Sequence, residues 1–141
     1  ERRLTNALVN KFNDDGNMEV VSQNSQAYLL DCEITQYDKE PLRYTSADVV
    51  YEERLRVYVR VKFSSPEWKM ISEKNVLGET TYFLSGTHYK SEGAAQDDLV
   101  ADAARRILEM VVQQWELYEN RVLHNFYNWI NLIASKTIAC D

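Results

Sequence analysis

The chain has 141 residues, of which 45% are hydrophobic, and a formal net charge of −6. This length suits one domain whose core needs no disulfide or metal to hold it. The acidic balance argues against nucleic-acid binding, because proteins that grip phosphate backbones usually carry a positive field. No run approaches the roughly 20 apolar residues of a membrane-spanning helix, so we expect a soluble domain.

The first predicted element is an amphipathic helix. Leu4, Leu8 and Phe12 recur at helical spacing, and Gly16 can adopt the left-handed conformation that ends helices. The helix begins almost at Glu1, without an initiator methionine before it. We therefore expect a fragment whose natural start is missing, and the lack of a targeting segment says little about compartment.

Three strands are predicted next, over residues 27–37, 49–63 and 68–83, because apolar residues alternate with polar ones there. Residues 39–44 between the first two are expected to form a loop or bulge, since Pro41 cannot donate to a strand ladder. Gly78 is expected to bulge or bend the third strand.

The middle strand carries the most unusual pattern. Its apolar row alternates with Arg54, Arg56, Arg60 and Lys62, and neighbouring cations of such a row lie roughly 6.6 Å apart at about 3.3 Å per residue. The row can bind an extended or multiply charged anion, and arginine's planar fork suits phosphate. Alternatively, it is a solvated face whose charges keep the sheet from aggregating.

A long final helix is predicted to begin near Glu92 or Ala95, and its apolar stripe continues at spacings of three or four to Ile133. We expect a break at residues 120–125, where asparagines and His124 lower helix propensity. The later stripe is either a second helix folded over the core or a partner-binding face. The residues of that face are Trp115, Tyr118, Val122 and Trp129.

The motifs of catalysis and metal binding are not seen in the sequence. Its four glycines are scattered, so they form no phosphate-cradling loop, and His88 and His124 have no ligand-spaced neighbours. A thiolate at Cys32 is disfavoured within an apolar strand face. We expect no enzyme, cofactor or metal. Cys32 and Cys140 can pair in an oxidising compartment; otherwise Cys32 is a core residue and Cys140 a terminal thiol.

Strands in the middle with helices at both ends predict an α+β fold. We expect a two-layer sandwich, in which helices pack on one face of a small mixed or antiparallel sheet. Residues 1–115 would form this domain, and residues 116–141 a helical extension.

The order of residues resembles the LptE family of lipopolysaccharide-assembly lipoproteins. The resemblance runs from about Arg3 to Trp115 and rests on order more than on an invariant signature. Its parts are the helix Arg3-Leu4-Thr5-Asn6-Ala7-Leu8 with its Gly turn, the strand from Ala27-Tyr28-Leu29-Leu30 to Ile34 and Tyr37, the segment Pro41 to Tyr44, the strand Tyr51-Glu52-Glu53-Arg54-Leu55-Arg56-Val57, and a last helix with Glu92, Ala95, Ala103, Ala104 and Leu108.

The resemblance implies a non-enzymatic, lipid-anchored protein on the periplasmic side of the outer membrane of a Gram-negative bacterium. Such a protein plugs and helps assemble the LptD translocon barrel and binds lipopolysaccharide. By position, Arg43 and Lys90 resemble the basic loop residues that contact the lipid's phosphates.

Two departures from the family accompany the resemblance. The lipidated cysteine and a first strand ahead of the helix are missing, and an open sheet position would invite pairing with another chain, a homodimer included. The aromatic tail after Trp115 is also outside the family pattern. A structural adaptor that binds a protein partner through this tail is therefore the alternative function.

Overall fold

The computed structural model describes residues 2–21, 26–126 and 137–140, and for residues 122–126 and 137–140 it describes the backbone alone. The elements in chain order are α1 (Arg2–Asp15), β1 (Glu19–Val21), β2 (Tyr28–Tyr44), β3 (Val50–Ser64), β4 (Met70–Phe83), α2 (Glu92–Phe126) and β5 (Thr137–Cys140). The α+β class predicted from the sequence is confirmed.

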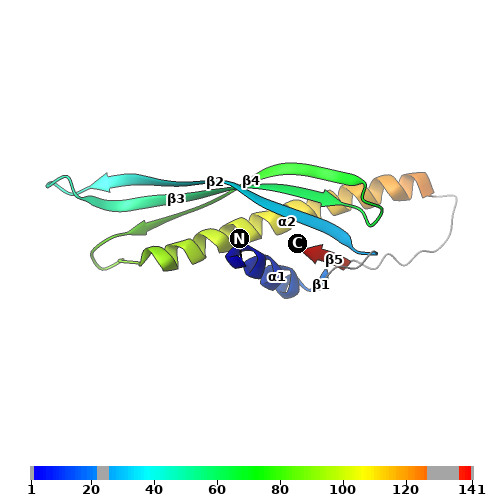
Figure 1. Cartoon of the computed structure of the whole chain (residues 1–141), viewed down its shortest axis with the longest axis horizontal. Helices are drawn as coiled ribbons and strands as arrows, with labels where there is room; N and C mark the ends of the chain where they lie inside the picture. Colours follow the sequence, from blue (N-terminus) through cyan, green and yellow to red (C-terminus); the bar gives the residue numbers. More distant parts are fainter. Residues whose placement is uncertain (1, 22–25, 127–136, 141) are drawn as a thin grey trace.

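The strands form one mixed sheet in the order β1-β5-β2-β3-β4. Antiparallel pairing joins β2 to β3 and β3 to β4, whereas β5 runs parallel to both β1 and β2. The long hairpins give the molecule its elongated shape (Figure 1). Because β5 pairs with Tyr28–Leu30, the sheet position that we expected to be open is filled there by the chain's own C-terminal strand.

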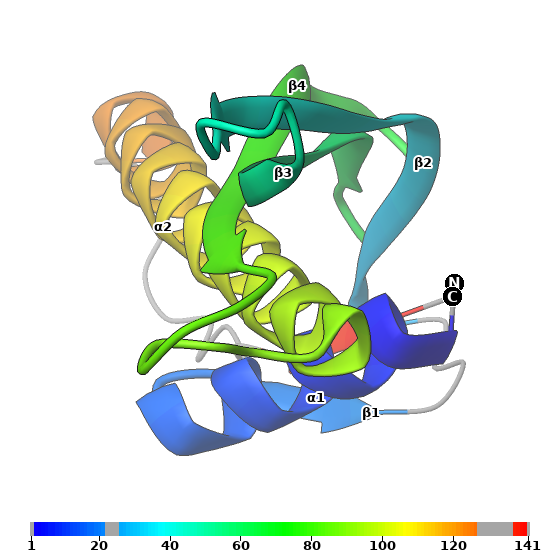
Figure 2. The same cartoon turned by 90° about the vertical axis from the view of Figure 1, so that its left-hand side faces the viewer.

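Both helices lie on one side of the β2-β3-β4 sheet, as the view along the long axis shows (Figure 2). Leu55, Val59 and Phe63 of β3 are fully buried beneath them, as the alternation predicted. Burying such a row supplies most of the stabilisation of a two-layer domain. Leu4, Leu8 and Phe12 bury the expected face of α1, and Gly16, at φ 71°, follows the helix end.

The segment around Pro41 corrects one prediction. Residues 39–44 belong to β2, which pairs with β3 as far as Tyr44, so a loop there is wrong. The bulge alternative is confirmed, since the register shifts between Pro41 and Arg43. An earlier shift, between Ile34 and Gln36, places Ile34 and Tyr37 beside the same groove although they are an odd number of residues apart.

The expected bulge at Gly78 is also wrong. The ladder between β3 and β4 runs through Gly78 without a register shift, so it neither bulges nor interrupts the strand. Instead, α2 approaches so closely that a Cβ atom at Gly78 would lie 2.7 Å from the Cβ of Ala103 and 3.0 Å from a methyl carbon of Val57. The glycine is therefore needed for close packing between helix and sheet.

Asp102 reinforces this contact beside Gly78. Its carboxylate accepts a hydrogen bond from the backbone N–H of Glu79 at 3.0 Å, and further hydrogen bonds from Arg105 and Arg106, three and four residues later in α2. Partial burial raises the pKa of Asp102, but these bonds outweigh it and leave the pKa below its usual value. The charged carboxylate thus joins α2 to β4.

The predicted break in the last helix is wrong, because α2 continues without interruption from Glu92 to Phe126. Asparagine and histidine lower helix propensity by only a few tenths of a kcal/mol each, and the flanking turns outweigh this. A second helix over residues 127–136 would lie outside the described residues.

Candidate functional site

The predicted row of cations lies on the face of the sheet opposite the helices. Arg54, Arg56 and Arg60 each pair with glutamates on both neighbouring strands. Arg54 lies 3.8 Å from both Glu40 and Glu79, Arg56 lies 3.1 Å from Glu40 and 3.2 Å from Glu79, and Arg60 lies 3.0 Å from Glu33 and 3.9 Å from Glu73. Lys62 stands opposite Asp31 and Glu73.

This pairing changes the interpretation of the row. The three arginines are already paired with carboxylates, and the hydrogen bond to Glu79 raises the pKa of Arg56. The geometry favours the alternative, a charged face on which cross-strand ion pairs cover the sheet. The acidic partners are present in the sequence as Glu33, Glu40, Glu73 and Glu79. Their pairing with the arginines becomes visible only when the register of the strands is known.

Arg43 and Lys90 come together at one end of the molecule. Arg43 lies opposite Glu52, which in turn lies opposite Phe83, so the backbones of Arg43 and Phe83 are two strand spacings, about 10 Å, apart. The N–H of Lys90 donates to the carbonyl of Phe83 at 3.0 Å. Arg43 therefore belongs to the end of the sheet, and Lys90 to the loop that joins this end to α2.

Over the described ranges, each of these two cations pairs with one carboxylate. Arg43 Nε lies 2.9 Å from Glu52, and Lys90 Nζ pairs with Asp98 of α2. The Arg43 side chain is nonetheless 70% exposed, against 26% for Arg56 in the row. Of the predicted cations, Arg43 is thus much better placed than Arg56 to meet a ligand from solvent.

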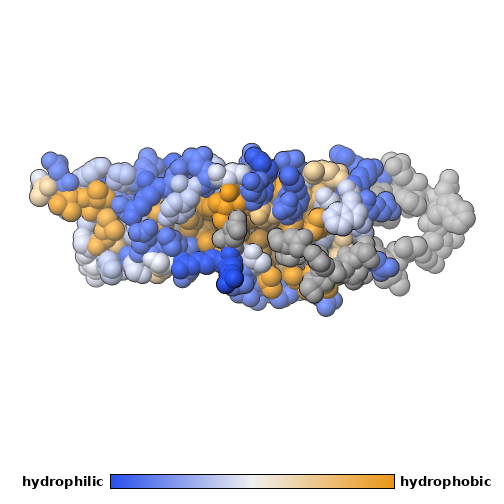
Figure 3. All heavy atoms as spheres, in the orientation of Figure 1, coloured by the Kyte–Doolittle hydropathy of each residue, from blue (hydrophilic) through white to orange (hydrophobic). Residues whose placement is uncertain are grey.

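Exposed apolar side chains accompany Arg43 and Lys90. Tyr44 and Tyr89, their immediate neighbours in sequence, are 56% and 63% exposed, and Val49 is exposed at the turn between β2 and β3. Figure 3 shows apolar surface at the end formed by this hairpin. The end thus combines cations with aromatic groups, a mixture suited to an amphiphilic anion.

A partly buried polar network supports this end of the sheet. The hydroxyl of Tyr82 donates to Glu53 at 2.5 Å, and Lys39 Nζ lies 3.1 Å from Glu53 and 3.0 Å from Glu92 at the start of α2. Burial and the bond to Glu53 raise the pKa of Tyr82 to about 12. Lys39 thereby ties the first turn of α2 to the sheet, a contact that the sequence pattern did not reveal.

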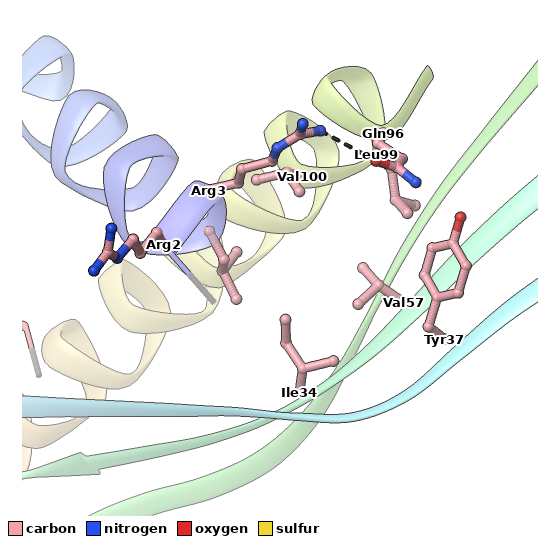
Figure 4. Close-up of a pocket in the computed structure, with 9 residues that line it drawn as sticks. Arg2, Arg3, Ile34, Tyr37, Val57, Gln96, Leu99 and Val100 are labelled. Atoms are coloured by element: carbon pink, nitrogen blue, oxygen red, sulfur yellow. Dashed lines mark hydrogen bonds between the residues drawn. The ribbon is translucent and has the colours of Figure 1, made fainter. Parts of the chain in front are cut away.

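An apolar groove of about 520 Å³ lies between the start of α1, the start of α2 and the strands β2 and β3. Its lining includes Ile34, Val57, Leu99 and Val100. Figure 4 shows Ile34 and Val57 between the strands and α2, with the guanidinium group of Arg2 directed away from them. Arg2, Arg3 and Gln96 also belong to the lining, so the groove offers mainly apolar atoms with two cations beside them.

The predicted partner-binding residues are placed differently from the expectation. Trp115 is only 4% exposed and packs against Tyr28, with ring centroids 4.2 Å apart, and against Phe63. Tyr118 also contacts Tyr28. Trp115 therefore belongs to the core, because the sheet reaches far enough along α2 to cover it. The side chains of Val122 and Trp129 lie outside the described residues.

The remaining site predictions concern cysteine, metals and membranes. Cys32 is half-buried on β2, and the backbone of Cys140 lies opposite Leu30. Within the described ranges, no three His, Cys, Asp or Glu side chains are grouped so as to hold a metal ion. Among the helices over those same ranges, none is both long and apolar enough to cross a bilayer.

Comparison with known proteins gives evidence that is independent of this geometry. The family model LptE, described as lipopolysaccharide-assembly, matches residues 1–114 and so ends within α2. The crystal structure of rare lipoprotein B from Shewanella oneidensis shares the fold, with a TM-score of 0.60 at 15% sequence identity over 82% of this chain and 89% of that chain. No protein with a curated description matches the sequence. Since the family model covers well over half of its length, the chain belongs to the LptE family, whose members are components of lipopolysaccharide assembly and not enzymes.

Proposed function

We propose that this protein binds lipopolysaccharide through the end of the sheet that carries Arg43 and Lys90. It would do so as a non-catalytic subunit of the outer-membrane translocon, seated as a plug in an LptD-like barrel. In the full-length protein a lipid anchor would hold it at the periplasmic side of the membrane. Membership of the LptE family supports the role in assembly; the binding residues and the plug are the proposal.

The observation that carries the choice of residues is the contrast in exposure between Arg43 and the paired row on β3. An incoming phosphate must displace or share the carboxylates already bound. In the row, Arg54 and Arg56 both pair with Glu40 and Glu79. A phosphate that binds either guanidinium group must therefore compete with two carboxylates. Among the described residues, Arg43 pairs with Glu52 alone, and its side chain is mostly in solvent.

The chemistry of the ligand fits this end. A guanidinium group binds phosphate with two parallel hydrogen bonds, and an ammonium group adds a mobile point charge. A phosphate carries more charge than a carboxylate at neutral pH, which favours its exchange for Glu52 or Asp98. Tyr44 and Tyr89 offer rings to the apolar faces of sugars and to acyl chains.

The test compares two double variants that each remove two positive charges. Arg43→Gln with Lys90→Gln is expected to weaken binding of purified lipopolysaccharide by about tenfold or more, since charge-assisted hydrogen bonds contribute about 1.5–3 kcal/mol each. The matched control, Arg56→Gln with Arg60→Gln, removes the same charge from the row and should change binding less than about threefold, because surface pairs contribute little.

Binding would be measured by titrating the full chain into labelled lipopolysaccharide at fixed ionic strength. Equal losses in both double variants would show a response to net charge alone and reject the proposed site. A larger loss in the control would transfer the site to the row on β3.

A further inference from the structure

The turn between β3 and β4 lies at the opposite end of the sheet from Arg43. Its backbone is held by hydrogen bonds from Trp68 N–H to the Ser65 carbonyl at 2.9 Å and from Ser65 N–H to the Lys69 carbonyl at 2.9 Å. The hydroxyl of Ser65 accepts a third, from Lys69 N–H at 3.3 Å. Pro66 fixes the first central position of the turn. The tip is therefore a rigid hairpin.

Trp68 occupies the strained position of this turn. Its φ of 62° lies in the left-handed region, which follows a type I turn in hairpins of this kind and favours glycine. A bulky side chain there clashes with its own backbone, so tryptophan is a clear outlier. Backbone strain of this kind is a recurring mark of functional positions.

The hairpin between β2 and β3 provides an internal reference. Asp48 N–H donates to the Thr45 carbonyl at 3.1 Å, Thr45 N–H donates to the Val49 carbonyl at 2.8 Å, and Asp48 has a φ of 57°. The two turns therefore share one geometry. Aspartate tolerates the left-handed conformation, so the geometry itself gives no reason for a tryptophan at the equivalent place.

Within the part of the chain that the structure describes, the indole of Trp68 makes little apolar contact. It is 76% exposed, and the neighbouring Met70 is 51% exposed. The strained backbone lowers the stability of the isolated protein, and a ring that stays in solvent contributes little to offset that loss. Because no contact among the described residues repays this loss, we look for its benefit in a surface outside the chain.

We propose that the hairpin residues Trp68 and Met70 dock into an apolar pocket on the protein partner, the barrel subunit of the translocon. This inference rests on the proposed function for the identity of the partner. Tryptophan is among the residues that most often dominate protein interfaces. A ring held in place before binding loses little entropy on docking, whereas methionine adapts to the pocket wall.

A protein surface fits these observations better than a lipid bilayer. Glu67 and Lys69 flank Trp68, so the turn carries no net positive charge, and the net charge of −6 on the chain opposes approach to anionic headgroups. A bilayer interface would also not require a rigidly presented ring. From Glu52 to Ser64, β3 spans twelve residue steps, about 40 Å at 3.3 Å per residue, so docking at Trp68 leaves the Arg43 end free for lipid (Figure 1).

The experiment compares Trp68→Gly with Asp48→Gly, two glycine substitutions at equivalent positions of equivalent turns. The full chain is co-expressed with the barrel protein encoded in the same genome, and the dissociation constant of the complex is measured. Trp68→Gly should weaken the complex by about thirtyfold, the size of an interface hot spot. It should also raise the melting temperature of the isolated chain, since the strain is removed. Asp48→Gly should leave the dissociation constant within about twofold.

An unchanged dissociation constant for Trp68→Gly would overturn the docking inference while the proposed function stands. If the wild-type chain binds no barrel, both fail together. Vesicles of phosphatidylethanolamine and phosphatidylglycerol provide the other outcome: binding of the wild-type chain that Trp68→Gly abolishes, with the barrel complex unaffected, would assign the hairpin to the bilayer. Lipopolysaccharide binding by Trp68→Gly should equal that of the wild type, because Arg43 and Lys90 are untouched.

Discussion

On the helix-covered face of β3, Leu55, Val59 and Phe63 are fully buried beneath α2, whereas on the opposite face Arg56 and Arg60 are held by glutamates of the neighbouring strands. The same fifteen-residue strand therefore takes part in two different kinds of interaction. Apolar contacts on the first face are not directional and depend on volume. Ion pairs on the second depend on register and weaken in salt. The charged face therefore covers the sheet, whereas the apolar face supplies most of the stability.

The largest expected effect comes from deleting a side chain of the covered face. Phe63→Ala should lower the free energy of unfolding by about 3–5 kcal/mol, because it leaves a cavity against Trp115 and Tyr28. Lys62→Ala, one residue away on the other face, should change it by less than about 0.5 kcal/mol. Denaturant unfolding of both variants measures the difference. Similar losses would show that the two faces are not distinct in the way described.

The second prediction concerns a substitution that adds atoms to the contact between sheet and helix. Gly78→Ala should cost about 1–3 kcal/mol, since the new methyl group meets Ala103 and the helix must shift. Gly93→Ala is the matched control, because a Cβ there meets nothing within 4 Å. Thermal and denaturant unfolding should separate the two alanine variants.

The double variant Gly78→Ala with Ala103→Gly sharpens this test. Moving the methyl group across the contact should make the double variant more stable than the sum of the single losses, by more than about 0.5 kcal/mol. An additive result would mean that Gly78 and Ala103 do not contact each other as described.

The smallest expected effect concerns the charged face. Arg60→Gln should lower the free energy of unfolding by less than about 1 kcal/mol at low salt, and the loss should vanish near 1 M salt, where screening extends over only about 3 Å. Glu33→Gln should behave alike, and a double-mutant cycle isolates the pair. A large loss of unfolding free energy that does not depend on salt would show that the row contributes to stability as much as the core does.

Particular elements show how far sequence reasoning reaches. The end of α1 before Gly16 and the alternation of β3 follow from local rules, and both are confirmed. Helix propensity at residues 120–125 was too weak a signal to predict a break, since differences of tenths of a kcal/mol do not interrupt a long helix. Gly78 was misjudged because its neighbour Ala103 is distant in sequence.

The candidate site shows the same limit. Arg43 and Lys90 could be named from their resemblance to family positions, and the register places them at one end. The exposure of Arg43 and the company of Tyr44 and Tyr89 required coordinates. Trp115 carried a pattern that suits a partner-binding stripe and a core equally, and only its contact with Tyr28 decides for the core.

By itself, the sequence determined the elements and their apolar faces, because alternation and helical spacing act over a few neighbouring residues. It also carried the order of elements by which the family is recognised. Only the tertiary structure shows which charges are paired, which glycine packs closely against a helix and which tryptophan is exposed to solvent. Each of these depends on atoms brought together from distant parts of the chain, and a charge or a ring acquires its role from those neighbours.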